Sequence, residues 1–163
     1  MTQVITYYLE QTDPKQIKEK PPVEHFKVIE AEIKQYQYNR FFYQSVGAEW
    51  DWKDKLQWSD IEWKDYAEKE ELHLYVGYYK GSPAGYFELE KQEEGNVEIS
   101  YFGLMPAFIG KGLGGYLLTK ALVNAWSFKD TQRVWVHTCS LDHPGALSNY
   151  RARGMRVYQE VSE

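Results

Sequence analysis

The sequence predicts an α/β protein whose central sheet is mixed and mostly antiparallel, with about six or seven strands and with helices on both faces. Short β-branched and aromatic runs separated by turn residues fill the earlier part of the chain, which favours antiparallel hairpins. The C-terminal part alternates strand-like runs with helical patterns, which favours a β-α-β-α-β arrangement. With 163 residues, of which 43% are apolar, the chain is expected to form a single domain, 1–163.

The first half is expected to hold two strands and two helices, over residues 3–9, 26–31, 34–46 and 60–70 in that order. Both strand segments are rich in β-branched and aromatic residues. Gly47 follows the first helical pattern and is expected to end that helix. Ser59 and Glu62 have the spacing of a capping box, in which each side chain bonds to the backbone N–H of the other residue, so the second helix is expected to begin there.

The second half gives clearer patterns. A short helix is expected at 144–152, and strands are expected at 72–79, 83–91, 97–104, 133–139 and 155–160. Lys80, Gly81 and Ser82 separate the first two of these strands as the turn of a hairpin. Apolar residues also recur on one face of a helix from 112 to 127, namely Leu113, Leu117, Leu118, Ala121, Leu122 and Ala125.

Composition and charge disfavour several classes of function. A net charge of −5 offers no basic field for nucleic acid. The single cysteine, Cys139, is typical of a reducing compartment, and the four histidines form no metal-ligand pattern with it. Neither a signal peptide nor a membrane-spanning run is evident. We therefore expect a cytoplasmic protein, monomer or homodimer, without metal, membrane or nucleic-acid partners.

Four glycines lie around the start of the predicted long helix: Gly110, Gly112, Gly114 and Gly115. A helix N-terminus offers free N–H groups and the positive end of the helix dipole, and glycines let an anion approach the backbone. The spacing also matches the dinucleotide fingerprint, although Met105 to Ile109 separate these glycines from the preceding strand. A dinucleotide site and a glycine-rich helix start without a ligand are therefore two possible interpretations of this segment.

This segment, Ile109-Gly110-Lys111-Gly112-Leu113-Gly114-Gly115, resembles the Gln/Arg-x-x-Gly-x-Gly/Ala signature of the GNAT superfamily of acetyl-CoA-dependent N-acetyltransferases. Ile109 stands where the family usually has Arg or Gln. Ala146, Tyr150 and Gly154 fall in register with the family's following helix, and His143 stands where Asn is usual. The resemblance spans about residues 72–161, and 38–63 is similar to a bacterial subgroup of the family.

The resemblance implies that acetyl-CoA is the acyl donor and that it binds to the core 72–161, with 1–70 as the acceptor-side part. The coenzyme-binding residues that it implies are Gly103, Leu104, Ile109, Gly110, Lys111, Gly112, Leu113, Gly114, Gly115, His143, Ala146 and Tyr150. Because Ile109 is apolar, the phosphates are expected to rest on backbone amides and on Lys111.

Forming an amide from a thioester needs a group that removes a proton from the amine, whose pKa is near 10.4, and a group that protonates the leaving thiolate. Glu98 is the candidate base and Tyr150 the candidate acid; the alternatives are a solvated strand residue and a packed tyrosine. Simple alternation places Glu98 on the face opposite to Ile99 and Tyr101. The family's strand bulge, which frees a backbone amide for the thioester carbonyl, is expected at Gly103–Leu104.

Four tryptophans crowd into 50–63. Core packing is one interpretation. The other is that Tyr43, Trp50 and Trp52 line an acceptor pocket that holds an ammonium ion or an apolar group against aromatic rings. The predicted function is transfer of an acetyl group from acetyl-CoA to a primary amine of a small molecule or peptide. A non-catalytic acyl-CoA-binding or sensing domain is the alternative.

Overall fold

A seven-stranded sheet is the centre of the fold in this computed structural model, which describes residues 3–163; the first two residues of the predicted domain lie outside it. The strands run in the order β2-β3-β4-β5-β6-β1-β7. Every neighbouring pair is antiparallel except β5 and β6. The predicted mixed, mostly antiparallel sheet is therefore confirmed. Its strands are β1 (Ile5–Gln11), β2 (Phe26–Glu30), β3 (Leu72–Tyr79), β4 (Ser82–Lys91), β5 (Asn96–Leu104), β6 (Arg133–Cys139) and β7 (Arg156–Ser162).

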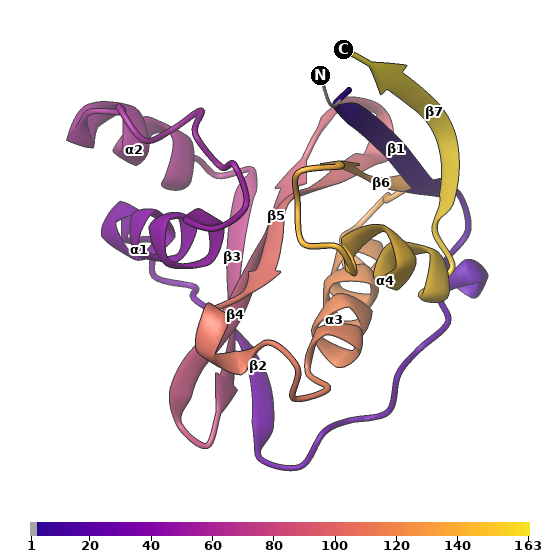
Figure 1. Ribbon diagram of the computed structural model, residues 1–163, viewed down its shortest axis with the longest axis horizontal. Helices are drawn as coiled ribbons and strands as arrows, with labels where there is room; N and C mark the ends of the chain where they lie inside the picture. The colour runs from indigo at the N-terminus through magenta and orange to yellow at the C-terminus, as the bar shows by residue number, and fades with distance from the viewer. Residues whose placement is uncertain (1–2) are drawn as a thin grey trace.

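Helices cover both faces of this sheet, as predicted. Helices α1 and α2 lie on one face and α3 and α4 on the other (Figure 1). No helix within residues 3–163 is long and apolar enough to cross a membrane. The α-helices are α1 (Tyr36–Gly47), α2 (Asp60–Ala67), α3 (Gly114–Ser127) and α4 (Ala146–Ala152), and single 3-10 turns occupy Pro14–Gln16, Glu93–Gly95 and Pro106–Phe108.

Strand β4 separates two apolar cores because successive side chains point to opposite faces of the sheet. Phe87 and Leu89 point toward α3 and belong to the larger core with the apolar side chains of that helix. Tyr86 points the other way and stacks on Phe42 of α1, with ring centroids 5.0 Å apart. The sheet is thus buried on both sides in its middle, which fixes the register of its central strands.

Helices α1 and α2 form where the sequence predicts them, although α1 begins two residues later than the predicted 34 and the ends of both helices are revised. Helix α1 ends at Gly47, but the role of this glycine is packing: an added Cβ would lie 2.5 Å from the side-chain Cβ of Trp52. The predicted capping box is present, since Ser59 Oγ accepts from the N–H of Glu62 and the Glu62 carboxylate accepts from the N–H of Ser59. Helix α2 ends at Ala67, three residues before the predicted end at 70.

The N-terminal strand lies inside the sheet instead of at its edge. Strand β1 pairs antiparallel with both β6 and β7, so it separates the last two strands of the predicted β-α-β-α-β tail. It covers Ile5–Gln11, two residues later than the predicted 3–9. Residues at the two ends of the chain thereby complete the half of the sheet that contains β6.

Strands β5 and β6 diverge from each other. Their parallel pairing is limited to Asn96–Glu98 on β5 and Arg133–Trp135 on β6. Beyond these residues the backbone groups on the facing edges of the two strands are not paired with each other, so the sheet opens toward the C-terminal end of β5. A ligand can approach main-chain N–H and C=O groups there.

The bulge on β5 lies at Ser100. Consecutive residues of β4 pair with Ile99 and Tyr101, which leaves Ser100 as the extra residue. The predicted bulge at Gly103–Leu104 is wrong, because both residues pair regularly with β4. Gly103 is required by packing instead: an added Cβ would lie 2.5 Å from Cγ1 of Val46 on α1.

Candidate active site

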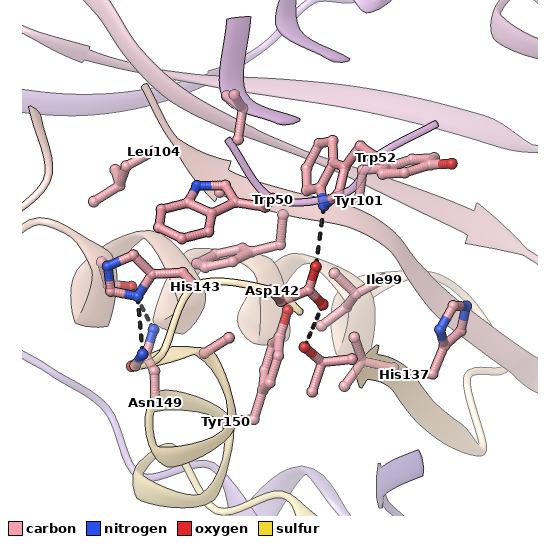
Figure 2. Close-up of a pocket in the computed structure, with 18 of the residues that line it drawn as sticks. Trp50, Trp52, Ile99, Tyr101, Leu104, His137, Asp142, His143, Asn149 and Tyr150 are labelled. Atoms are coloured by element: carbon pink, nitrogen blue, oxygen red, sulfur yellow. Dashed lines mark hydrogen bonds between the residues drawn. The ribbon is translucent and has the colours of Figure 1, made fainter. Parts of the chain in front are cut away.

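A pocket of about 780 Å³ opens where β5 and β6 diverge (Figure 2). Its walls come from these two strands, the glycine loop at the start of α3, helix α4 and the loop between α1 and α2. Segments that the sequence assigns to the coenzyme and to the acceptor therefore meet in one space. The predicted site residues that line it are Trp50, Trp52, Glu98, Gly103, Leu104, Ile109, Gly110, Gly112, Leu113, Gly114, Gly115, His143, Ala146 and Tyr150.

Two predicted site residues do not line this pocket. Tyr43 is 1% exposed, and its hydroxyl donates to Asp54 at 2.8 Å and accepts from the N–H of Lys55 at 3.0 Å. Tyr43 is therefore a core residue that holds the α1–α2 loop, and its prediction as an acceptor contact is wrong. Lys111 is exposed and lies outside the residues that line the pocket.

The glycine loop owes its shape to two residues with left-handed backbones. Gly110 has a φ of +87° and Gly112 a φ of +77°, a region that side chains with a Cβ disfavour. Because of Gly112, helix α3 begins at Gly114 and not at residue 112 as predicted. The N–H groups of its first turn have no helical partner, so this end of the pocket presents donors and the positive end of the helix dipole. That arrangement suits an anion.

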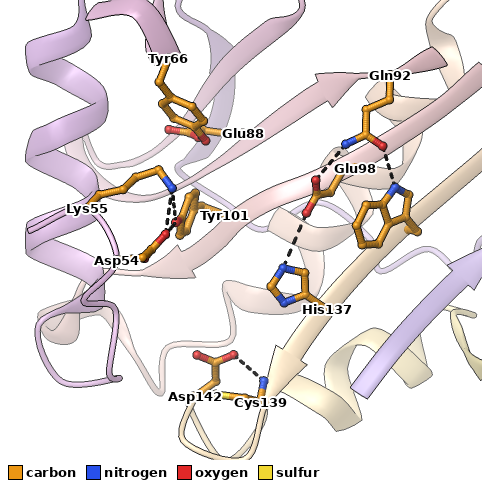
Figure 3. Close-up of polar contacts among 11 residues, drawn as sticks. Asp54, Lys55, Tyr66, Glu88, Gln92, Glu98, Tyr101, His137, Cys139 and Asp142 are labelled. Carbon is orange, nitrogen blue, oxygen red and sulfur yellow. Dashed lines mark hydrogen bonds and ion pairs between the residues drawn. The ribbon is translucent and has the colours of Figure 1, made fainter. Parts of the chain in front are cut away.

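Glu98 sits in the pocket with its charge poorly solvated, because its side chain is only 14% exposed. Trp135 donates through Nε1 to the amide oxygen of Gln92, which leaves the Gln92 nitrogen to donate to Glu98 at 3.0 Å (Figure 3). Nε2 of His137 lies 3.7 Å from the other carboxylate oxygen. Burial raises the pKa of Glu98 to about 7, and the charge of Glu90 adds to the effect. Such a carboxylate can accept a proton near neutral pH.

Tyr150 lies on the other wall of the pocket, on α4. It is 5% exposed and packs on Phe102 of β5, with ring centroids 5.9 Å apart. Burial raises the pKa of Tyr150 well above its ordinary value, and the negative charge of Asp142 acts in the same direction. The phenol therefore stays protonated over the physiological range, and its O–H is available as a hydrogen-bond donor in the pocket.

The bulge at Ser100 decides which side chains of β5 share a face. Ile99 belongs to the core under α3, so Glu98 points to the face that carries α1. Tyr101 packs on the core under α1, on the same face as Glu98. Simple alternation predicted opposite faces for Glu98 and Tyr101; that prediction is wrong because the extra residue reverses the order of sides. Phe102 is thereby turned toward Tyr150.

Two loops meet across the pocket. Nε1 of Trp52, on the α1–α2 loop, donates to Asp142 at 3.2 Å, and the hydroxyl of Thr138 donates to the other oxygen of the same carboxylate (Figure 2). Trp50 meets the ring of His143 edge to face, with centroids 5.1 Å apart. The α1–α2 loop is therefore hydrogen-bonded to the β6–α4 loop, and these two loops bound the pocket on opposite sides where they meet.

Lys55 places an alkylammonium group in the part of the pocket lined by Asp54, Tyr66 and Tyr101, here called the aromatic arm (Figure 3). Its Nζ donates to Asp54 at 2.9 Å and to the hydroxyl of Tyr101 at 2.8 Å. The same nitrogen lies 4.7 to 4.9 Å from the ring centroids of Trp58, Tyr66 and Tyr101. Although burial opposes it, hydrogen bonds from Lys55 and its neighbours lower the pKa of Asp54. A carboxylate and three aromatic faces thus surround one cation.

Several of these contacts could not be found from sequence. Lys55 and Tyr101 are 46 residues apart, and Trp52 and Asp142 are 90 apart. The cluster of tryptophans is the only local signal for the first pair, and the second has none. Among residues 3–163 no group of three or more His, Cys, Asp or Glu side chains is arranged to hold a metal ion.

Comparison with protein families identifies the chain. Residues 30–155 match the model of the acetyltransferase (GNAT) family, which is most of the sequence. The chain belongs to this family. The glycine loop, the diverging strands and helix α4 all lie within the matched residues, so the matched region supplies most of the pocket lining; Thr6 and Lys20, which also line it, precede that region. No curated protein sequence matches the chain significantly.

Solved GNAT structures share the fold. A GCN5-related N-acetyltransferase from Sphaerobacter thermophilus matches with a TM-score of 0.72 at 14% identity, over 98% of this chain and 50% of that one. A GCN5-related N-acetyltransferase from Kribbella flavida matches with a TM-score of 0.70 at 14% identity, over 97% of this chain and 56% of that one. An aminoglycoside acetyltransferase from an uncultured soil metagenomic sample, solved with trehalose, matches with a TM-score of 0.60 at 14% identity, over 79% of this chain and 87% of that one. The chain thus spans about half the length of the first two, and the likeness shows the fold alone.

Proposed function

We propose that this GNAT acetyltransferase moves the acetyl group of acetyl-CoA to a primary amine of a small molecule or peptide. One observation carries the proposal: the glycine loop, Glu98 and Tyr150 line the same pocket. An anion-binding element, a carboxylate that titrates near pH 7 and a protonated phenol therefore face one space. Acyl transfer from a coenzyme thioester needs these three functions together.

The residues at the coenzyme end fit the donor. The left-handed glycines and the free N–H groups of α3 suit a diphosphate, and the unpaired edges of β5 and β6 suit the amide groups of a pantetheine arm. The coenzyme supplies an acyl group activated as a thioester. The N–H of Met105 donates to the carbonyl of Ala84 on β4, so alternation turns the N–H of Leu104 away from β4, toward the side from which β6 has diverged. On the protein side, this N–H would polarise the thioester carbonyl.

Glu98 and Tyr150 divide the proton transfers between them. Glu98 removes a proton from the acceptor amine, directly or through a water, because with a pKa of about 7 roughly half of these carboxyl groups are ionised at neutral pH and the ionised form accepts a proton readily. A carboxylate near the usual value of 4.5 would be a much weaker base. Tyr150 gives its phenolic proton to the thiolate that leaves.

We assign the aromatic arm of the pocket to the acceptor amine. The cluster of Asp54, Trp58, Tyr66 and Tyr101 already surrounds one alkylammonium group, that of Lys55. Tyr66 is held in place by its hydroxyl, which donates to the carboxylate of Glu88. An acceptor amine would enter this arm beside Lys55, whose charge Asp54 offsets, and would contact the rings of Tyr66 and Tyr101.

Release of the coenzyme thiol tests the proposal. The parent protein is incubated with acetyl-CoA and a panel of alkylamines, diamines, amino acids, aminoglycosides and peptides with free N-termini. We expect thiol release that depends on an amine, slowed by up to about 10²-fold in Tyr150→Phe. Tyr158→Phe, at a position 40% exposed on β7, is the matched control and should match the parent. Tight binding of coenzyme A without turnover on any amine contradicts the proposal and supports a non-catalytic acyl-CoA-binding domain.

A further inference from the structure

We infer that Arg153 and Lys20 form a cationic anchor for a phosphate of the coenzyme's nucleotide part, in place of the basic side chain that the glycine loop lacks at Ile109. The inference rests on the proposed function, because it names further residues that would hold the same donor. Both side chains line the pocket at its glycine-loop end. They come from segments far apart in the sequence, the end of α4 and the connection between β1 and β2.

The guanidinium group of Arg153 lacks partners that it needs. Its Nε and Nη1 atoms are fully buried and have no hydrogen-bond partner. Within residues 3–163, none of the ion pairs closer than 4.0 Å includes Arg153 or Lys20. Arginine keeps its charge in proteins, and burying such a donor unpaired costs several kcal/mol. An anion bound at this position would remove that cost.

Gly115 brings the two cations to the start of α3. A Cβ added to Gly115 would lie 2.8 Å from Cγ of Lys20 and 3.0 Å from Nη1 of Arg153. Both side chains therefore pass directly over the second residue of the helix, whose N–H belongs to the unpaired first turn. Two positive side chains and the positive end of the helix dipole converge on one place, which is unfavourable unless an anion is bound there.

Backbone contacts fix the two chain segments that carry these side chains. The carbonyl of Arg153 accepts from the N–H of Lys18 at 2.9 Å, and the N–H of Lys20 donates to Oγ1 of Thr119 on α3 at 2.9 Å. Gly154 adopts a φ of +98°, and a Cβ there would collide with the carbonyl oxygen of Gln16. The β1–β2 connection is thus fixed against α3 and the end of α4, so the anchor is part of the fold and does not depend on a mobile surface chain.

The loop's own side chains do not provide this charge. Ile109 is apolar, and Lys111 is exposed and lies outside the residues that line the pocket. The sequence alone assigned phosphate contact to Lys111. Lys20 and Arg153 instead provide cationic groups at the helix start, and planar Arg153 can bind two phosphate oxygens at once.

Binding measurements by calorimetry test the anchor without requiring turnover. Coenzyme A, 3′-dephospho-coenzyme A and pantetheine are titrated into the parent and into Arg153→Gln and Lys20→Met. We expect Arg153→Gln to weaken coenzyme A binding by about 10- to 100-fold and Lys20→Met by about tenfold, from the usual contribution of charge-assisted hydrogen bonds. Pantetheine, which has no phosphate, should bind all three proteins equally.

Two matched variants control for a general loss of positive charge. Lys18→Met, on the same connection as Lys20 but outside the pocket lining, and Arg151→Gln on the exposed side of α4 should bind coenzyme A within about threefold of the parent. An effect of Arg153→Gln that persists with 3′-dephospho-coenzyme A assigns the contact to the diphosphate, and one that disappears assigns it to the 3′-phosphate; both support the anchor. If Arg153→Gln does not fold, Lys20→Met, on a different segment, gives the same comparison.

The inference and the proposed function fail in different ways. A parent that binds coenzyme A while Arg153→Gln and Lys20→Met bind it equally well contradicts the anchor alone. An equal loss of affinity for coenzyme A and pantetheine also contradicts it, because the effect would not involve a phosphate. A parent that binds no coenzyme A contradicts the proposed function and, with it, the anchor.

Discussion

Replacing Glu98 with glutamine should make the protein more stable and less active at the same time. The side chain is 14% exposed and lies near Glu90, and its pKa rises from 4.5 to about 7 on folding. The folded protein therefore binds this proton more tightly than the unfolded chain does. The free energy of unfolding accordingly falls as the pH rises through this window, and the full cost of the charge is present above pH 7.

The size of the effect follows from the two pKa values. One pKa unit corresponds to about 1.4 kcal/mol, so a difference between 4.5 and about 7 corresponds to roughly 3 kcal/mol. Glutamine keeps the shape and can still bond to Gln92, but it carries no charge. Glu98→Gln should therefore be more stable than the parent by up to roughly 3 kcal/mol at pH 8, and nearly equal to it at pH 4.

Urea unfolding at several pH values between 4 and 8 measures the difference directly. Glu160→Gln, at an exposed position on β7, is the matched control and should change stability by less than about 0.5 kcal/mol at every pH. In Glu98→Gln, kcat/KM should fall by about 10²- to 10⁴-fold. The parent's plot of kcat/KM against pH should rise through pH 7, and this rise should be absent in Glu98→Gln. A variant that is no more stable than the parent at pH 8, or that keeps this rise, refutes the role given to Glu98.

Three further variants test other parts of the site. Tyr150→Phe should lower kcat by up to about 10²-fold. Its Kd for coenzyme A should stay within about threefold of the parent's, because the ring still packs on Phe102. A large loss of affinity for coenzyme A would contradict the role of Tyr150 as an acid. Gly112→Ala should reduce the free energy of unfolding, measured in urea, by about 1–2 kcal/mol, because an added Cβ has free space but disfavours the backbone φ of +77°. An unchanged midpoint of urea unfolding would contradict this backbone strain. Asp142→Ala should raise the KM of the amine more than the Kd of coenzyme A, as Trp52 loses its partner, and equal changes would contradict that link.

Local patterns predict the elements of this fold well. Helix α3 is found from its apolar face and its glycines, and the capping box at Ser59 and Glu62 marks the start of α2, because both signals lie within one or two turns of chain. The insertion of β1 between β6 and β7 depends on pairings across nearly the whole chain. No residue within β1 itself indicates its partners, so the sequence could not give this topology.

The site was predictable only in part, for the same reason. Glu98 and Tyr150 are found through the family's order of motifs. The bulge at Ser100 has no local marker, and Gly103, a plausible marker, is small because Val46 of α1 needs the space. Arg153 becomes notable only once the fold leaves its guanidinium nitrogens buried without partners.

Mass spectrometry of the product tests the proposed transfer most directly. The parent is supplied with acetyl-CoA carrying an isotopically labelled acetyl group and with the amine that gives the fastest thiol release. The proposed chemistry predicts one labelled amide for each thiol released, formed much more slowly by Glu98→Gln at pH 7. Thiol release without a labelled amide, or equal rates of amide formation in the parent and Glu98→Gln, would contradict it.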